Sequence, residues 1–105
     1  MAKDNQYYLR KIIGDAIADG WTITARVEDE VDYRGTDKRK ALDALTACDE
    51  MLMVLTKEVD GVTLRERVFI VNDISNEPEE IIANYALTKT GWVDAWWNQN
   101  IGAAA

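Results

Sequence analysis

The residues of this chain that could carry chemistry are mainly carboxylates. Four acidic side chains fall within five positions: Glu28, Asp29, Glu30 and Asp32. Hard divalent cations take oxygen ligands, so a cluster of this kind could hold one. However, the spacing differs from that of an EF-hand loop, and no glycine stands at the required turn. We therefore expect no metal ion there, and interpret the cluster either as a solvated loop or as a surface that faces a partner.

A second acidic group, Glu77, Glu79 and Glu80, surrounds Pro78 and follows Asn76. Asparagine is a good N-cap, proline fits the first helical turn, and carboxylates favour the positive end of a helix. A glutamate three residues after the cap can also complete a capping box. This group therefore predicts the start of a helix rather than a metal site.

Residue types that most catalytic sites need are missing. The chain has no histidine and a single cysteine, Cys48, which removes His-based triads and the usual zinc ligand sets. The sequence also lacks the GxGxxG, GxxxxGK[ST] and GxSxG motifs. Cys48 falls on the apolar stripe of a predicted helix, where we expect a buried, inert thiol. We expect no catalytic residue and no cofactor.

Three arginines suit binding rather than catalysis. Arg26, Arg65 and Arg67 could hold a small anionic ligand of the nucleotide type, together with an aromatic wall. Arg65 and Arg67 are two positions apart, so they share one face if the segment is a strand.

The tryptophan-rich end offers a different kind of contact. Trp92, Trp96 and Trp97 lie within six positions, and at about 100° per residue the apolar side chains cover about half of a helix surface. A short helix that rests on a sheet buries a narrower stripe. The tryptophans therefore either complete the core, or one of them faces a protein partner or a second copy of the chain.

The chain is acidic overall, with 19 acidic residues, 12 basic residues and a net charge of −7. The acids are spread along the sequence, so the average field repels phosphate and we expect no direct nucleic-acid binding. The same field suits docking onto a basic surface, including one that normally holds DNA or RNA. It is equally compatible with a general role in keeping the protein dissolved.

Helical spacing of apolar residues predicts the helices that must position these groups. Asp4 can cap the first helix, which ends where Gly20 can adopt the left-handed conformation. Thr36 or Asp37 can cap the second. The predicted ranges are 5–19, 37–49, a third helix from Asn76 to the break at 89–91, and a short helix at 92–99, followed by a frayed tail at 101–105.

The strands follow from alternation and from one turn signal. Residues 21–27 alternate as a half-buried strand, and 51–59 is apolar along most of its length, as for a strand covered on both faces. Asp60-Gly61 separates that run from 62–71 and favours a type I′ hairpin turn. The acidic segment 28–35 is predicted to be a loop.

Together these patterns predict a single α+β domain over residues 1–105. Its expected architecture is a three-stranded antiparallel sheet with helices packed on it, in the order αβαββα plus a short C-terminal helix. No apolar run is long enough to span a membrane, and the first ten residues lack a secretory pattern. No membrane partner is therefore expected.

A wider pattern joins Ala47-Cys48-Asp49-Glu50 to the segment NEPEEIIANY at residues 76–85. It resembles small, uncharacterised accessory proteins of tailed phages and prophages, and the resemblance spans most of residues 9–86. This chain differs in having Asn84 where that resemblance leads us to expect an acid, and in its tryptophan-rich end. The resemblance implies a phage-derived protein in the host bacterial cytoplasm, and it carries over no catalytic residue.

Two functional hypotheses lead among those that follow from the sequence, and an enzyme that uses carboxylates and a metal ion is a third. The first is a non-enzymatic phage accessory protein that binds a host or phage macromolecule through the acidic cluster and the tryptophans. Its sharpest form is an acidic inhibitor of a nucleic-acid-binding protein. The second is a small-ligand protein that binds nucleotides through the three arginines. Self-association is compatible with both, because an exposed tryptophan or a free strand edge permits a dimer.

Overall fold

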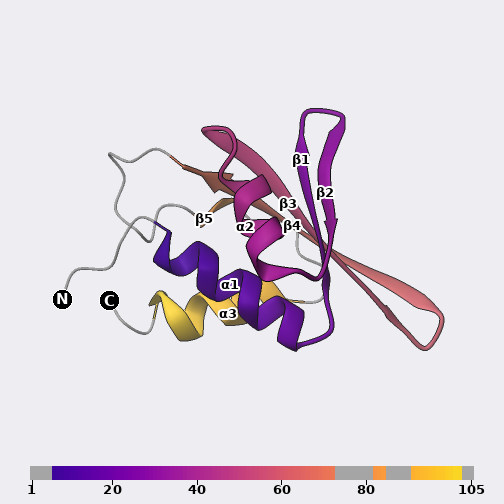
Figure 1. Cartoon of the computed structure of the whole chain (residues 1–105). Coiled ribbons are helices and arrows are strands. Elements are labelled where there is room, and N and C mark those ends of the chain that lie inside the picture. Colours follow the sequence, from indigo (N-terminus) through magenta and orange to yellow (C-terminus); the bar gives the residue numbers. More distant parts are fainter. Residues whose placement is uncertain (1–5, 73–81, 85–90, 103–105) are drawn as a thin grey trace.

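The computed structural model describes residues 6–72, 82–84 and 91–102, which form three helices and an antiparallel sheet (Figure 1). The helices are α1 (Tyr7–Ala18), α2 (Lys38–Leu45) and α3 (Trp92–Asn100), and the strands are β1 (Thr22–Val27), β2 (Glu30–Gly35), β3 (Glu50–Val59), β4 (Val62–Val71) and β5 (Ile82–Asn84). The predicted α+β class is confirmed. Within the described ranges, no helix is long and apolar enough to span a lipid bilayer.

The sheet has the order β2-β1-β3-β4, with the short strand β5 beside β4, and all pairings are antiparallel. The prediction of three strands is wrong because the supposed loop at 28–35 contains β2. Glu28 turns the chain with a φ of 54°, and β2 then returns along β1. As an edge strand β2 exposes most of its side chains, so it lacks the apolar alternation by which strands are recognised. With β5 left aside, the element order is αββαββα.

The predicted third helix is wrong at residues 82–84, which form β5 and pair with β4. Ile82 lies opposite Ile70 and its side chain is buried, so an apolar residue that suggested a helical stripe serves a strand instead. The rest of the predicted helix, including Asn76 and Glu79, lies outside the described residues, as does Asp4. The predicted short last helix is confirmed as α3.

The β3–β4 hairpin matches its prediction closely. Asp60 and Gly61 both have positive φ values, 53° and 80°, as a type I′ turn requires. The register then runs unbroken from the pair Val59 and Val62 to the far end of both strands. Figure 1 shows that this hairpin extends beyond the helices, and both valines are exposed at its end.

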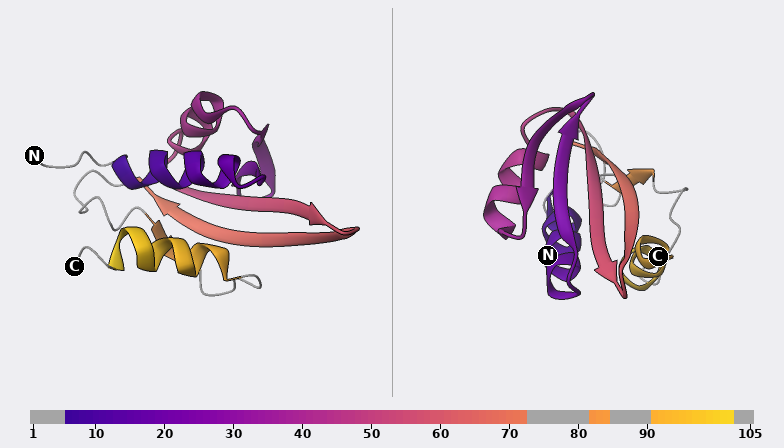
Figure 2. Two further views of the ribbon diagram at one scale, coloured as in Figure 1. Left: turned by 90° about the horizontal axis from the view of Figure 1, so that it is seen from below. Right: turned by 90° about the vertical axis from the view of Figure 1, so that its right-hand side faces the viewer.

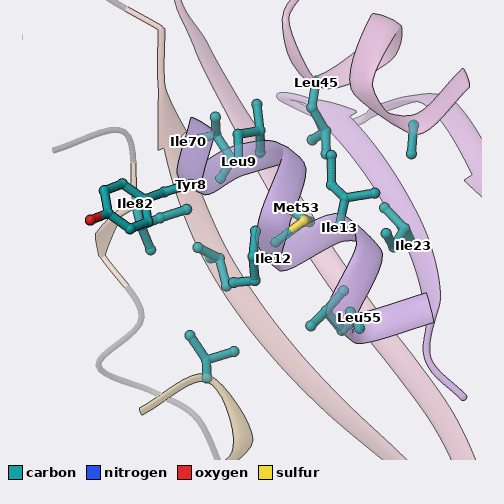
Figure 3. Close-up of a cluster of buried hydrophobic side chains, with 14 of the residues drawn as sticks. Tyr8, Leu9, Ile12, Ile13, Ile23, Leu45, Met53, Leu55, Ile70 and Ile82 are labelled. Carbon is teal, nitrogen blue, oxygen red and sulfur yellow. The ribbon is translucent and has the colours of Figure 1, made fainter. Parts of the chain in front are cut away.

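The core lies between one face of the sheet and the helices. On α1, the predicted apolar stripe is buried except at Ile17, which is partly buried, and alternate residues of β3 face it (Figure 3). Each such large apolar side chain contributes about 1.5–3 kcal/mol by leaving water. The central members of this core are Leu9, Ile12, Ile13, Ile23, Leu45, Met51, Met53, Leu55, Val68 and Ile70.

The second helix begins as predicted and ends earlier. The Asp37 carboxylate accepts a hydrogen bond from the Lys40 backbone N–H at 3.0 Å, which confirms the cap. At the other end, the Asn72 side-chain amide donates to the carbonyl oxygens of Leu45 and Cys48, both at 2.7 Å. The helix therefore stops at Leu45 instead of continuing to residue 49. The prediction of a buried thiol is wrong as a consequence, because Cys48 lies outside the helix and is exposed.

The C-terminal end of α3 is more ordered than predicted. The Ile101 N–H donates to the Trp97 carbonyl oxygen at 2.8 Å, and the Ile101 side chain is 5% exposed within the core. The prediction of a frayed tail is therefore wrong at residue 101. Residues 103–105 lie outside the described residues.

Candidate binding surface on the open face of the sheet

The described helices cover one face of the sheet and leave the other face open. Side chains on a strand alternate between faces, and in β1 and β3 the residues opposite to the core set are Thr22, Thr24, Arg26, Leu52, Val54 and Thr56. The register aligns these residues with one another across the two strands. We call the surface that they form, together with their cross-strand neighbours on β2 and β4, the open face.

The open face carries four arginines in three neighbouring cross-strand rows. Arg34 and Arg67 occupy the two ends of the central row, while Arg26 and Arg65 lie in the rows on either side. The rows read Arg34–Thr24–Val54–Arg67, Val31–Arg26–Leu52–Phe69 and Thr22–Thr56–Arg65. The structure thus brings together Arg26, Arg65 and Arg67, as the small-ligand hypothesis requires, and adds Arg34.

The centre of the open face is covered by the arginines themselves. Thr24 is 3% exposed and Val54 is 7% exposed, although the register places both opposite to the core face. Arg34 Nε donates a hydrogen bond to Thr24 Oγ1 at 3.2 Å, and the register places Arg67 directly beside Val54. Arginine stems commonly cover apolar surface while the guanidinium remains in water. The guanidinium groups are therefore presented to solvent above the buried side chains of Thr24 and Val54.

No acidic side chain within residues 6–72, 82–84 and 91–102 forms an ion pair with any of these arginines. The ion pairs there join Lys11 to Asp15 and Lys57 to Asp19, all on α1 or on the side of the sheet that faces it. Arg26 Nε is buried and has no hydrogen-bond partner among the same residues. Four like charges on adjoining strands repel one another, so an added anion would relieve this repulsion.

Exposed apolar side chains adjoin the arginines at one end of the open face. Phe69 is 40% exposed and Val31 is 50% exposed, and both lie in the row that contains Arg26. Along β3, the rows are bounded by Glu50 and Glu58, which are exposed and pair with Val71 and Thr63 of β4. The arginine cluster therefore has a limited extent, with an aromatic ring near one boundary.

The predicted acidic cluster lies at the end of the β1–β2 hairpin. Glu28 and Asp29 form the turn, and Glu30 and Asp32 follow on β2. All four are exposed, and Asp32 is the additional residue of a bulge in β2. Among the described residues, no group of three or more acidic or cysteine side chains is arranged to hold a metal ion. The cluster is thus a solvent-facing acidic end of the hairpin, and its role in partner binding stays a prediction.

Helices α1 and α3 run antiparallel (Figure 2), and the three tryptophans of α3 lie in or against the core. Trp96 is buried, and its Nε1 donates to Asp15 Oδ2 at 2.8 Å. Trp92 is partly buried and contacts Trp21, with ring centroids 6.0 Å apart. Trp97 is partly buried against Gly102. Trp96 therefore belongs to the core, and a partner contact by the remaining edges of Trp92 and Trp97 stays a prediction.

A buried carboxylate outside the predicted sites positions this helix. Glu66 of β4 is fully buried, and its Oε1 accepts from the backbone N–H groups of Trp92 at 3.1 Å and Val93 at 3.5 Å. The N-cap of α3, Gly91, makes no side-chain cap, so Glu66 stabilises the first turn from across the core. The alternation of β4, with Val68 and Ile70 inward, was the available signal, because it places Glu66 on the same face.

Arg34 also lies outside the predicted sites. It lies in the segment 28–35, and a loop prediction assigns no sheet face to its residues. The alternation of Val31, Tyr33 and Arg34 in β2 is interrupted by the bulge at Asp32, which hides the two-residue period in the sequence.

Comparison of the chain with protein-family models, with curated proteins and with solved structures gives no match. The function is therefore inferred from the open face and from the charged groups around it.

Proposed function

We propose that this chain is a non-enzymatic binding protein that holds a phosphate-bearing ligand on the open face of its sheet. One observation supports the proposal above all. Arg26, Arg34, Arg65 and Arg67 gather on one face without a carboxylate partner among the described residues, in a chain whose net charge is −7.

The chemistry of the arginines supports phosphate as the recognised group. A guanidinium presents several N–H donors in a plane, so it can donate two parallel hydrogen bonds to a phosphate or carboxylate. Arg65, Arg67 and Arg34 are exposed, and none of them forms an ion pair with an acid in the described structure. A bound polyanion would replace repulsion among the arginines by attraction and would stabilise the fold.

Thermal unfolding in the presence of phosphate compounds tests this proposal. A ligand that binds only the folded state at about 100 times its dissociation constant should raise the melting temperature by about 10 °C. Nucleoside mono-, di- and triphosphates and pyrophosphate are suitable probes. We expect the shift to grow with the number of phosphates.

Two substitutions separate the open face from other basic sites. Arg67→Gln should weaken binding by about 10- to 100-fold, because hydrogen bonds to charged groups contribute about 1.5–3 kcal/mol. Arg39→Gln is the matched control, since Arg39 is exposed on α2, and it should leave the shift unchanged. Equal shifts in both variants, or no shift with any phosphate compound, would refute the proposal.

The second candidate is an acidic phage accessory protein that inhibits a nucleic-acid-binding protein of the host cytoplasm. It is favoured by the four exposed acids at the end of the β1–β2 hairpin, Glu28, Asp29, Glu30 and Asp32. A projecting acidic turn can enter a basic channel, and its attraction to that channel should weaken with salt.

Affinity capture from bacterial lysate tests this second candidate. The wild-type chain should retain a stoichiometric partner at low salt, and a variant with all four acids changed to Gln or Asn should lose it. Retention of the same partner by the variant, or capture of no partner at low or physiological salt, counts against the inhibitor function while leaving phosphate binding untouched.

A further inference from the structure

The four arginines of the open face are too widely spread for one phosphate group. Arg34 on β2 and Arg67 on β4 are separated by three strand spacings, or about 14 Å between backbones. Arg65 and Arg67 are two residues apart on β4, which corresponds to about 7 Å. The arrangement therefore fits a ligand that carries several phosphates along a chain better than one that carries a single compact anion.

An aromatic ring continues the same line. Arg65, Arg67 and Phe69 occupy alternate positions of β4, so all three project from the open face. Phe69 is 40% exposed although it is a large apolar residue. A nucleobase offers a flat surface to such a ring, and base stacking on an aromatic side chain tolerates any base.

From this combination we propose that the ligand of the open face is single-stranded nucleic acid, an inference that rests on the proposed function. Phosphates of an extended strand contact Arg65, Arg67 and the arginines of β1 and β2, and a base stacks on Phe69. Thr22 and Thr56 lie in the same cross-strand row as Arg65, where hydroxyl groups can donate to phosphate or sugar oxygens.

A duplex and an acidic polypeptide fit the surface less well. The bases of a duplex are stacked inside it and reach a protein only through the grooves, whereas the open face is a broad sheet surface. An acidic polypeptide could pair with the arginines but has no group that requires the exposed Phe69. The cations on the described open face are all arginine, since Lys57 of β3 contacts Asp19 on the opposite side.

The acidity of the whole chain acts on the open face mainly through the few carboxylates nearest to it. Its carboxylates nearest to the open face lie at the row boundaries and at the end of the β1–β2 hairpin. Glu58 is two positions from the Arg65 row, or about 7 Å along β3, whereas exposed charges beyond about 10 Å are largely screened at ordinary salt. Net repulsion lowers the overall affinity, so we expect binding that is modest and strongly dependent on salt.

Fluorescence anisotropy with labelled oligothymidylates of increasing length tests the inference on the full chain. Affinity should increase with length beyond the mononucleotide, should fall as salt is raised, and should exceed that for a duplex of equal length or for an oligoglutamate of equal charge. Arg67→Gln should reduce the slope of log K against log salt by about one unit. Arg39→Gln should leave that slope unchanged.

Substitution of Phe69 tests base stacking separately from the attraction between charges. Phe69→Leu keeps an apolar side chain and removes the ring, so it should weaken oligonucleotide binding by about tenfold with an unchanged salt slope and an unchanged melting temperature. Phe69→Ala provides a second variant. Unchanged oligonucleotide affinity in both, with unfolding curves that confirm the fold, would overturn stacking and hence the inference.

The remaining outcomes separate this inference from the proposed function. If nucleoside triphosphates bind through Arg67 but oligothymidylates bind no more tightly, the single-strand inference fails and phosphate binding stands. Equal binding of duplex or of oligoglutamate also overturns the inference. If no phosphate compound binds at all, both proposals fail together.

Discussion

Glu66 illustrates how one buried carboxylate can connect the sheet to a helix. Its oxygen receives the first N–H groups of α3, which would otherwise be unsatisfied donors inside the protein. A buried donor left without a partner costs about 1–3 kcal/mol, so this contact contributes more than an exposed cap would. The side chain also lies opposite Leu55 on β3, where most residues are apolar.

Substitution of Glu66 should therefore be costly. Glu66→Ala leaves two backbone donors without this acceptor and opens a cavity, so we expect the free energy of unfolding to fall by about 2–4 kcal/mol. Glu66→Gln retains an acceptor oxygen and should lose less. Urea denaturation measures both changes, with Glu58→Gln on the open face as the exposed control. A loss in Glu66→Ala no larger than in that control would contradict the capping role.

The first helix contains an unused opportunity for stabilisation. Gly14 lies inside α1 and its φ is not positive, so its conformation does not require glycine. An added Cβ would lie 3.9 Å from the nearest side-chain atom, on Lys38, which is an ordinary contact distance.

Gly14→Ala should accordingly raise the free energy of unfolding by about 0.5–1 kcal/mol, because alanine loses less backbone entropy on folding. Gly61→Ala is the opposite case, since Gly61 has a φ of 80° in the hairpin turn, and should lower stability. Thermal or urea unfolding of the two variants checks the contrast. The same sign of change in both would show that local backbone conformation does not govern these positions.

The elements that were predicted correctly share strong local signals. The apolar stripe of α1 and the Asp60-Gly61 turn are each predicted from a few adjacent residues, and both are present in the structure. The misassigned elements depend on distant partners. β2 forms because it pairs with β1. Helix α2 ends at Leu45 because the side chain of Asn72, a residue beyond β4, donates a hydrogen bond to the Leu45 carbonyl oxygen. Neither partner can be read from the sequence window that surrounds the element.

At the scale of the whole molecule, charge is segregated rather than averaged. A net charge of −7 disfavours nucleic-acid binding on average, whereas the fold concentrates four arginines on one sheet face and leaves four acids at the end of a hairpin. Arg26, Arg65 and Arg67 can be proposed as a binding site from the sequence. That they lie on the same sheet face follows only from the register of the four strands. Net charge governs the long-range attraction or repulsion of a ligand, while the charges on the open face determine which ligand can bind in direct contact with it.

All four tryptophans of the chain, Trp21, Trp92, Trp96 and Trp97, lie in or against the core beneath the helices. The described open face contains none of them, so its aromatic ring is the phenylalanine. Intrinsic fluorescence of this protein therefore monitors the packing of α1 and α3 on the sheet. Tryptophan fluorescence thus reports on folding, but it does not report directly on binding at the arginines. Detection of a ligand there requires a fluorescent label on the ligand.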